Sequence, residues 1–174
     1  MSIEPDTKDW TWVIQRPCPE CGFEAGAVAP DQVGGMIRKN ASGWAPVFDR
    51  DVSQRPLPDV WSPLEYACHV RDVLRLYGER LQLMLTQDDP LYPNWDQDAT
   101  AVAERYGEQD PATVAAELQA AAAPLADRFD NLSPEQWRRT GRRSDGASFT
   151  VETFSQYFLH DIVHHLHDVE HPPA

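Results

Sequence analysis

Apolar residues recur at steps of three and four in the stretch that follows Ser62, which is the pattern of an amphipathic helix. They are Tyr66, Val70, Val73, Leu74, Tyr77, Leu81 and Met84. The stretch opens with "SPLE", which puts Ser62 at the N-cap, Pro63 at the first helical position and Glu65 where a capping box requires a carboxylate. The pattern predicts a helix over residues 63–87.

An earlier helix is predicted over residues 31–48, beginning at Asp31 after Pro30 and carrying "DQVGGMIRKNASGWAPVF". Gly34, Gly35 and Gly43 weaken it, because each glycine costs a helix about 1 kcal/mol relative to alanine. Its ends are therefore less sharply defined than those of the helix after Ser62.

Two further long helices are predicted in the second half of the chain. One covers residues 111–132 after the cap Asp110, and Pro124 inside it is expected to bend it or to end it a turn early. The other begins near Thr150 and carries residues 151–171. A short helical piece is expected over residues 98–106.

No segment alternates apolar and polar residues over the length of a strand, so little or no sheet is expected. Four amphipathic helices bury their apolar faces most simply against one another. The predicted fold is therefore all-α, a four-helix bundle over residues 30–174, preceded by an N-terminal extension over residues 1–29 with a Cys-x-x-Cys loop. The interior of such a bundle is also where metal sites are built.

Charge and composition exclude some classes of binding partner. The 174 residues carry a net charge of -13, which repels nucleic acid and anionic lipid, so neither nucleic acid nor a membrane is expected as a partner. The first residues lack the pattern of a signal peptide, and three cysteines are too few for a secreted disulfide scaffold. We expect a cytoplasmic protein with reduced thiols that acts on a small molecule.

The stretch "LHDIVHHLHDV", residues 159–169, holds four of the six histidines and is the strongest chemical signal in the chain. His160 and His164 stand four residues apart on one helical face, and Asp161 and His165 form the same spacing in the next register. Either pair suits a divalent metal ion. A third ligand must come from elsewhere, and His69 on the helix after Ser62 is the available histidine.

The spacing alone does not choose between the two pairs. On a helical wheel the apolar residues of this segment centre closer to His165 than to His160 or His164, which favours Asp161 with His165. His167 and His171 are explained by the favourable interaction of a histidine with the C-terminal end of a helix.

"WSPLEYACHVRDV" and "HDIVHHLHDV" resemble the second-helix and last-helix signatures of the DinB-like, YfiT-like four-helix bundles. This family includes thiol-dependent S-transferases and the mycothiol-dependent maleylpyruvate isomerase group, and the resemblance covers roughly residues 30–170. It implies that His69 is a metal ligand. The all-histidine form of the site gives the predicted set His69, His160 and His164, while the isomerase-like form gives the runner-up pair Asp161 and His165.

The resemblance implies one divalent metal ion, zinc or nickel, with an open coordination position. There the ion would activate a low-molecular-weight thiol, mycothiol or a similar one, which attacks an electrophilic substrate or aids an isomerisation. A metal-dependent hydrolase of the same fold and a non-catalytic metal-binding stress protein are the alternatives, beside an interaction bundle with surface histidines. A homodimer is a further expectation.

Cys18 and Cys21 in "RPCPECGFEAG" depart from the family pattern. The Cys-x-x-Cys spacing is half of a zinc knuckle or a dithiol pair, but no second pair follows it. Three readings stay open: a structural loop, redox or thiol chemistry near the metal, and a secondary metal site shared across a dimer. Cys68 is expected in the core.

Overall fold

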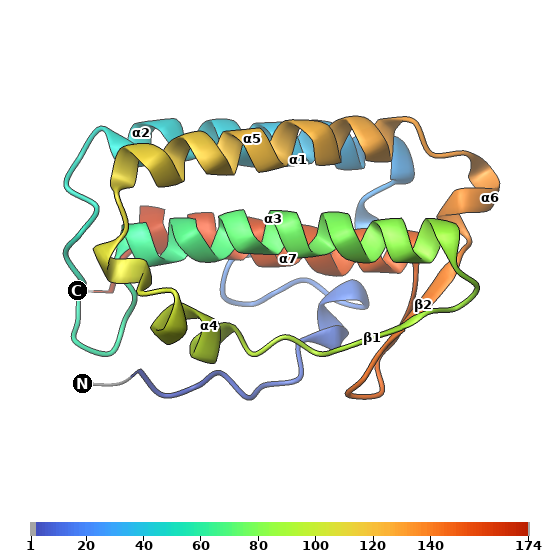
Figure 1. Ribbon diagram of the computed structural model, residues 1–174, viewed down its shortest axis with the longest axis horizontal. Coiled ribbons are helices and arrows are strands. Elements are labelled where there is room, and N and C mark those ends of the chain that lie inside the picture. Colours follow the sequence, from blue (N-terminus) through green and yellow to red (C-terminus); the bar gives the residue numbers. More distant parts are fainter. Residues whose placement is uncertain (1–2, 174) are drawn as a thin grey trace.

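Four long helices run side by side and form the body of the protein (Figure 1), whose computed structural model describes residues 3–173. They are α1 (Val33–Gly43), α3 (Pro63–Thr86), α5 (Pro111–Asp130) and α7 (Val151–Glu170). Helices α1 and α5 pair on one side and α3 and α7 on the other (Figure 1), with further contacts of α5 to α3 and of α7 to α1. The predicted all-α four-helix bundle is confirmed.

The core between the four helices is built from aromatic and aliphatic side chains. The Tyr77 ring lies 4.7 Å from the ring of Phe154 and 5.0 Å from that of Phe158, and all three side chains are buried. Leu81 and Phe129 are buried in the same cluster. Each such side chain contributes roughly 1.5–3 kcal/mol through its removal from water, so this cluster fixes α3 against α7.

The beginning of α3 is the one that the sequence predicts. The Glu65 backbone N–H donates to the Ser62 side chain at 3.2 Å, and the Ser62 N–H donates to a Glu65 carboxylate oxygen at 2.8 Å. Arg55 also donates to that carboxylate from its Nε at 2.8 Å, so the capping residue is part of an ion pair. The helix ends at Thr86, one residue before the predicted end.

Helices α5 and α7 begin at the predicted caps. Asp110 accepts from the Thr113 N–H at 2.8 Å, and Thr150 accepts from the Thr153 N–H at 3.1 Å. Pro124 was expected to bend its helix or to end it a turn early, and the early end does not occur, because α5 continues past Pro124 to Asp130. Packing of α5 against both α1 and α3 offsets the single hydrogen bond that the proline removes.

The single helix predicted over residues 31–48 is divided in the structure. A 3₁₀-helix, η3 (Pro30–Gln32), leads into α1, and the short α2 (Ala45–Phe48) follows after a break at the buried Trp44. Pro46 has no N–H to donate to the carbonyl of Ser42, so the helical ladder is interrupted at this point.

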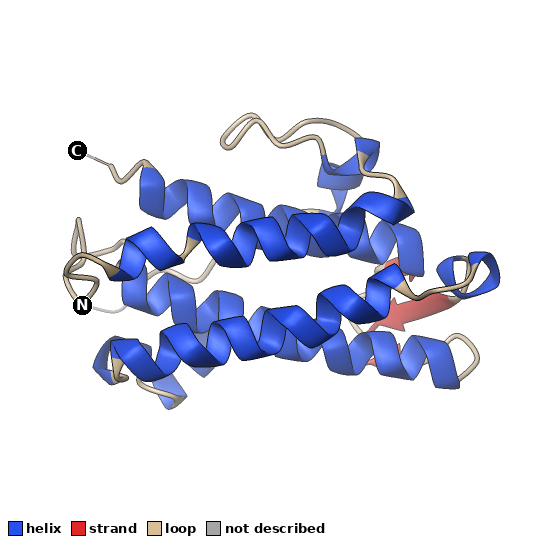
Figure 2. Ribbon diagram, turned by 90° about the horizontal axis from the view of Figure 1, so that it is seen from above, coloured by secondary structure: helices blue, strands red, loops and turns tan. Residues whose placement is uncertain are grey.

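A small sheet lies at one end of the bundle (Figure 2). Its strands are β1 (Leu91–Tyr92), β2 (Thr140–Arg143) and β3 (Ser148–Thr150), with β1 parallel and β3 antiparallel to β2. Little sheet was expected, and nine residues of strand agree with that. Short helices fill the connections: α4 (Gln97–Ala103), in the predicted region, η4 (Tyr106–Glu108) and α6 (Pro134–Trp137). None of the helices between residues 3 and 173 is long and apolar enough to cross a membrane.

The N-terminal extension is packed against the bundle. Its 3₁₀-helices η1 (Thr11–Ile14) and η2 (Ala25–Ala27) contact α7, on the α3–α7 side of the molecule (Figure 1). Gln156 on α7 donates to the carbonyl of Val28 at 3.1 Å. A Cβ at Gly26 would lie 2.3 Å from the backbone oxygen of Ile14, so only glycine lets η1 and η2 approach this closely. The extension therefore covers a face of α7 that would otherwise be exposed.

Candidate metal centre

His69 on α3 meets Asp161 and His165 on α7, and one ligand atom of each lies within 4.8 Å of those of the other two. The Nε2 atom of His69 is 3.0 Å from Oδ1 of Asp161, and Nε2 of His165 is 3.6 Å from the same oxygen. Two ligand atoms about 2.1 Å from one ion at a tetrahedral angle lie about 3.4 Å apart. The donor atoms and their spacing therefore fit a divalent metal ion.

Asp168 orients one of these imidazoles. Its Oδ2 lies 3.1 Å from Nδ1 of His165, on the side of the ring away from Asp161. A proton on Nδ1 that is donated to this carboxylate leaves the Nε2 lone pair free to bind an ion. The spacing of three residues between His165 and Asp168 is the signal in the sequence for this role.

The charges of the three groups also suit a metal ion. Burial lowers the pKa of His69, which favours the neutral imidazole. Burial alone would raise the pKa of Asp161, but the neighbouring His69 and His165 outweigh it and lower that pKa to about 2, so the carboxylate is ionised. His165 is the exception, because the carboxylates of Asp168 and Asp161 outweigh its burial and raise its pKa. An ion would have to displace a proton there.

Aromatic rings hold His69 in place. The Trp95 ring stacks on its imidazole with centroids 5.4 Å apart, and the Trp61 ring lies 5.5 Å away. His69 is fully buried, and its Nδ1 has no hydrogen-bond partner among residues 3–173. Its orientation is therefore set by packing and by the contact with Asp161. No pattern in the sequence indicates the approach of Trp95.

A cavity of about 850 Å³ opens beside the cluster, and Asp161 and His165 line it. Its opposite wall comes from the extension, residues 5–11, and from residues 94–98. Arg80 and Arg143 bring positive charge to the lining, and the Arg143 Nη1 donates to the Tyr157 hydroxyl at 3.3 Å. The volume accommodates a drug-sized molecule.

The predicted ligand set His69, His160 and His164 is not brought together as one group among the described residues. His160 and His164 instead lie with Cys18 and Cys21, again with ligand atoms within 4.8 Å of one another. The two pairs of the last helix thus lie in different clusters. Asp161 and His165 lie with α3, and His160 and His164 lie with the N-terminal extension.

Burial on α7 also differs from the helical wheel. The His164 side chain is 10% exposed and the His165 side chain 18%, and His160 is buried. The wheel considered α7 against the bundle alone, whereas the extension covers the other face: the Trp10 ring lies 5.5 Å from that of His160 and 5.4 Å from that of His164.

The cysteines are reduced and are not arranged as reactive thiols. Burial raises the pKa of Cys21 to about 11, whereas reactive cysteines have a lowered pKa. Cys68 is buried in the core, as expected, and its thiol donates to the Tyr106 carbonyl at 3.8 Å. Burial therefore disfavours the nucleophilic thiolate form of both Cys21 and Cys68.

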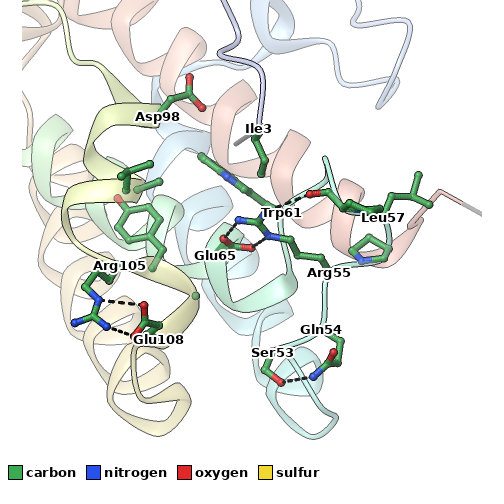
Figure 3. A pocket seen from close by; sticks show the side chains of 16 residues that line it. Ile3, Ser53, Gln54, Arg55, Leu57, Trp61, Glu65, Asp98, Arg105 and Glu108 are labelled. Atoms are coloured by element: carbon green, nitrogen blue, oxygen red, sulfur yellow. Dashed lines mark hydrogen bonds and ion pairs between the residues drawn. The ribbon is translucent and has the colours of Figure 1, made fainter. Parts of the chain in front are cut away.

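A second cavity, of about 680 Å³, lies near the beginning of α3 (Figure 3). The Arg55–Glu65 ion pair and Trp61 line it, and Arg105 pairs with Glu108 at its edge (Figure 3). Because Trp61 also packs against His69, the ring lies between this cavity and the histidine cluster. No metal-ligating cluster of the described residues lies in this cavity.

Comparison with known proteins agrees with this architecture. The family model described as the DinB superfamily matches residues 39–169. Among solved structures, the chain is similar to one described as "YfiT from Bacillus subtilis is a probable metal-dependent hydrolase with an unusual four-helix bundle topology". The TM-score is 0.62 and the identity 17%, over 97% of this chain and 91% of that one, so the match bears on the fold. No curated protein matches the chain.

Proposed function

This chain belongs to the DinB superfamily, and from that premise and the His69–Asp161–His165 cluster we propose that it is a metal-dependent enzyme. The cluster would hold one divalent ion, zinc or nickel, and the substrate would bind in the cavity of about 850 Å³ beside it. The observation that carries this proposal is the convergence of two imidazoles and one carboxylate, from two helices, at the wall of that cavity.

Three protein ligands leave a coordination position for an exogenous molecule, which is typical of a catalytic rather than a structural metal. An ion bound there would lower the pKa of a water or thiol and so supply a nucleophile near neutral pH. Asp168 holds the proton on Nδ1 of His165 and thereby keeps Nε2 turned toward Asp161. Arg80 and Arg143, which line the cavity, would bind an anionic group of the substrate.

We infer that the nucleophile is a low-molecular-weight thiol such as mycothiol. The chain's own thiols do not supply it, because Cys68 is buried in the core and Cys18 and Cys21 lie in the separate cluster with His160 and His164. The cavity has room for such a thiol together with a small electrophile. Hydrolysis is the second candidate, and the resemblance in fold to a protein described as a probable metal-dependent hydrolase favours it.

The experiment uses the full chain without a histidine tag, loaded with zinc or nickel. Mycothiol and other small thiols are offered with a haloarene electrophile, and activated esters are offered in separate assays. Formation of the thioether supports thiol transfer, and metal-dependent ester cleavage without it supports the hydrolase. If neither reaction depends on metal, the enzyme proposal fails.

Two variants of the same helix test the site. His165→Ala is expected to bind one equivalent of metal less than the wild type and to lose the activity. His167→Ala is the matched control, since that ring stacks on His171 with centroids 4.2 Å apart and belongs to neither cluster. Equal metal content in the two variants would refute the assignment of His165.

A further inference from the structure

The Cys-x-x-Cys loop of the extension faces α7 beside His160 and His164. Cys18, Cys21, His160 and His164 each offer a ligand atom within 4.8 Å of those of the other three. Cys18, His160 and His164 are buried, and Cys21 is half-buried. These four residues do not overlap with the three proposed for the catalytic metal.

The loop is shaped to present both thiols to the same point. The Gly22 N–H donates to the Cys18 carbonyl at 2.8 Å, and the Cys18 N–H donates to the Phe23 carbonyl at 2.9 Å. Gly22 has a φ of 73°, a conformation that glycine adopts without strain. The chain thus folds back within six residues, and the two sulfur atoms lie on the side that faces α7.

The histidines are oriented toward the thiols. Nδ1 of His164 lies 3.8 Å from Sγ of Cys18, close to the separation of about 3.6 Å expected for a sulfur and a nitrogen on one tetrahedral zinc. The Nε2 of His164 lies 3.5 Å from a carboxylate oxygen of Glu20 and 3.7 Å from one of Asp168. A proton on Nε2 beside these carboxylates leaves Nδ1 as the metal-binding atom.

His160 provides separate evidence for a bound cation. Its Nε2 is buried and has no hydrogen-bond partner among residues 3–173. An imidazole nitrogen without a partner costs about 1–3 kcal/mol when it is withdrawn from water. A cation bound by the cluster offers this ring a partner that the described side chains do not.

We propose that Cys18, Cys21, His160 and His164 bind a structural zinc ion that fastens the N-terminal extension to α7. Two thiolates and two imidazoles form a closed tetrahedral set with no position for substrate, which is the pattern of a structural site. Thiolate ligands also select zinc over magnesium or calcium. The chain would therefore have two metal sites of different chemistry, and the residues that argue for this second one are separate from those that argue for the proposed enzyme activity.

The proposed zinc ion would also hold one wall of the cavity in place. Residues 5–11 of the extension line the cavity beside His165, and the Cys-x-x-Cys loop follows shortly after η1 in the chain. Trp10 lies against both His160 and His164. Holding the loop on α7 therefore holds the wall of the cavity, so the ion would keep the substrate site closed on that side.

The test begins with the wild type, reduced, untagged and purified without added metal, and needs no variant. Replacement of its bound metal by cobalt is expected to give the near-ultraviolet charge-transfer absorption of thiolate–cobalt bonds and the visible bands of tetrahedral cobalt. One addition of a thiol-modifying mercurial should release one equivalent of zinc from the zinc-loaded protein. Absence of the thiolate absorption in the cobalt protein would overturn the proposal.

Variants locate the site. Cys18→Ser with Cys21→Ser is expected to lose one equivalent of zinc and the thiolate absorption while keeping the metal at His165. Cys68→Ala is the matched control, a cysteine outside both clusters, and should keep both signals. A thiolate absorption that survives the double substitution would refute the assignment. Because loss at His165 leaves the cysteine signal intact, failure of the enzyme proposal and failure of this one are distinguishable.

Discussion

Asp168 offers a quantitative test of the proposed catalytic site, because it contacts His165 without belonging to the ligand set. Its Oδ2 lies 3.1 Å from Nδ1 of His165. Carboxylates in this position typically change metal affinity by 10–100-fold. The Asp168 side chain is 29% exposed, so water screens part of its charge and the smaller end of the range applies. We expect Asp168→Ala to weaken binding about tenfold, or about 1.4 kcal/mol.

The Asp168→Asn variant separates the effect of orienting the His165 ring from the effect of the carboxylate charge. An asparagine oxygen still accepts from Nδ1 of His165, but a hydrogen bond without an ionised partner is roughly half as strong. The loss should therefore be about 0.7 kcal/mol, which is about threefold in affinity. We also predict the order of metal affinity, which should fall from the wild type to Asp168→Asn and further to Asp168→Ala.

The measurement is a competition titration of metal-free protein with zinc and a chelator of known affinity. Asp168 also lies 3.7 Å from His164, so the titration is performed in the Cys18→Ser, Cys21→Ser background, where only the site at His165 keeps its full ligand set. Glu170→Ala is the matched control, since it removes an exposed carboxylate from the same end of α7. Equal affinities for Asp168→Ala and Glu170→Ala would refute the role of Asp168.

Three further predictions concern stability. Removing bound metal with a chelator should lower the melting temperature by about 5–11 °C, since saturation at 100 times the dissociation constant contributes about 2.7 kcal/mol; an unchanged calorimetric melting curve would contradict a bound ion. Gly34→Ala should destabilise the fold by about 1–3 kcal/mol in urea, because the new Cβ would lie 2.1 Å from an Asp130 oxygen and 2.8 Å from the Ala126 carbonyl oxygen, whereas Gly35→Ala, with nothing within 4 Å, should stabilise it by about 1 kcal/mol. Glu65→Gln should cost about 1–3 kcal/mol at pH 7, because Arg55 loses its charged partner but is partly exposed to water. Burial opposes ionisation of Glu65, but its ion pair with Arg55 outweighs this and lowers its pKa, so the stabilisation is present above the unfolded-state pKa and is lost as the pH falls through the folded value. Urea unfolding at pH 3 should therefore show a smaller difference between wild type and variant than at pH 7, and an equal difference would contradict the ion pair.

The parts of the fold that could be predicted are those fixed by neighbouring residues. The capping box at Ser62 and Glu65 depends on four consecutive positions, and the structure contains it as expected. The division of the first helix depends on Pro46, whose missing N–H opposes the helix that the apolar pattern around it favours. The continuation of α5 past Pro124 depends on contacts with two other helices, which no local pattern contains.

The candidate site likewise has one part that the sequence predicts and another that depends on tertiary packing. That His69 and a pair on the last helix belong together follows from spacing and from the family resemblance. Which pair faces His69 depends on the rotation of α7 in the bundle, and the burial of His160 and His164 depends on an extension that a helical wheel does not include. The approach of Cys18 to His164 spans 146 residues and could not be read from either motif alone.

The two clusters use one helix because their ligand pairs are offset by a single residue. One step along an α-helix rotates a side chain by about 100°, so His160 and His164 face the extension while Asp161 and His165 face α3. The offset keeps the ligand sets separate, but it also places Asp168 beside both, 3.1 Å from His165 and 3.7 Å from His164. In the proposed arrangement a change at the structural zinc therefore reaches the catalytic ion through this carboxylate as well as through the wall of the cavity.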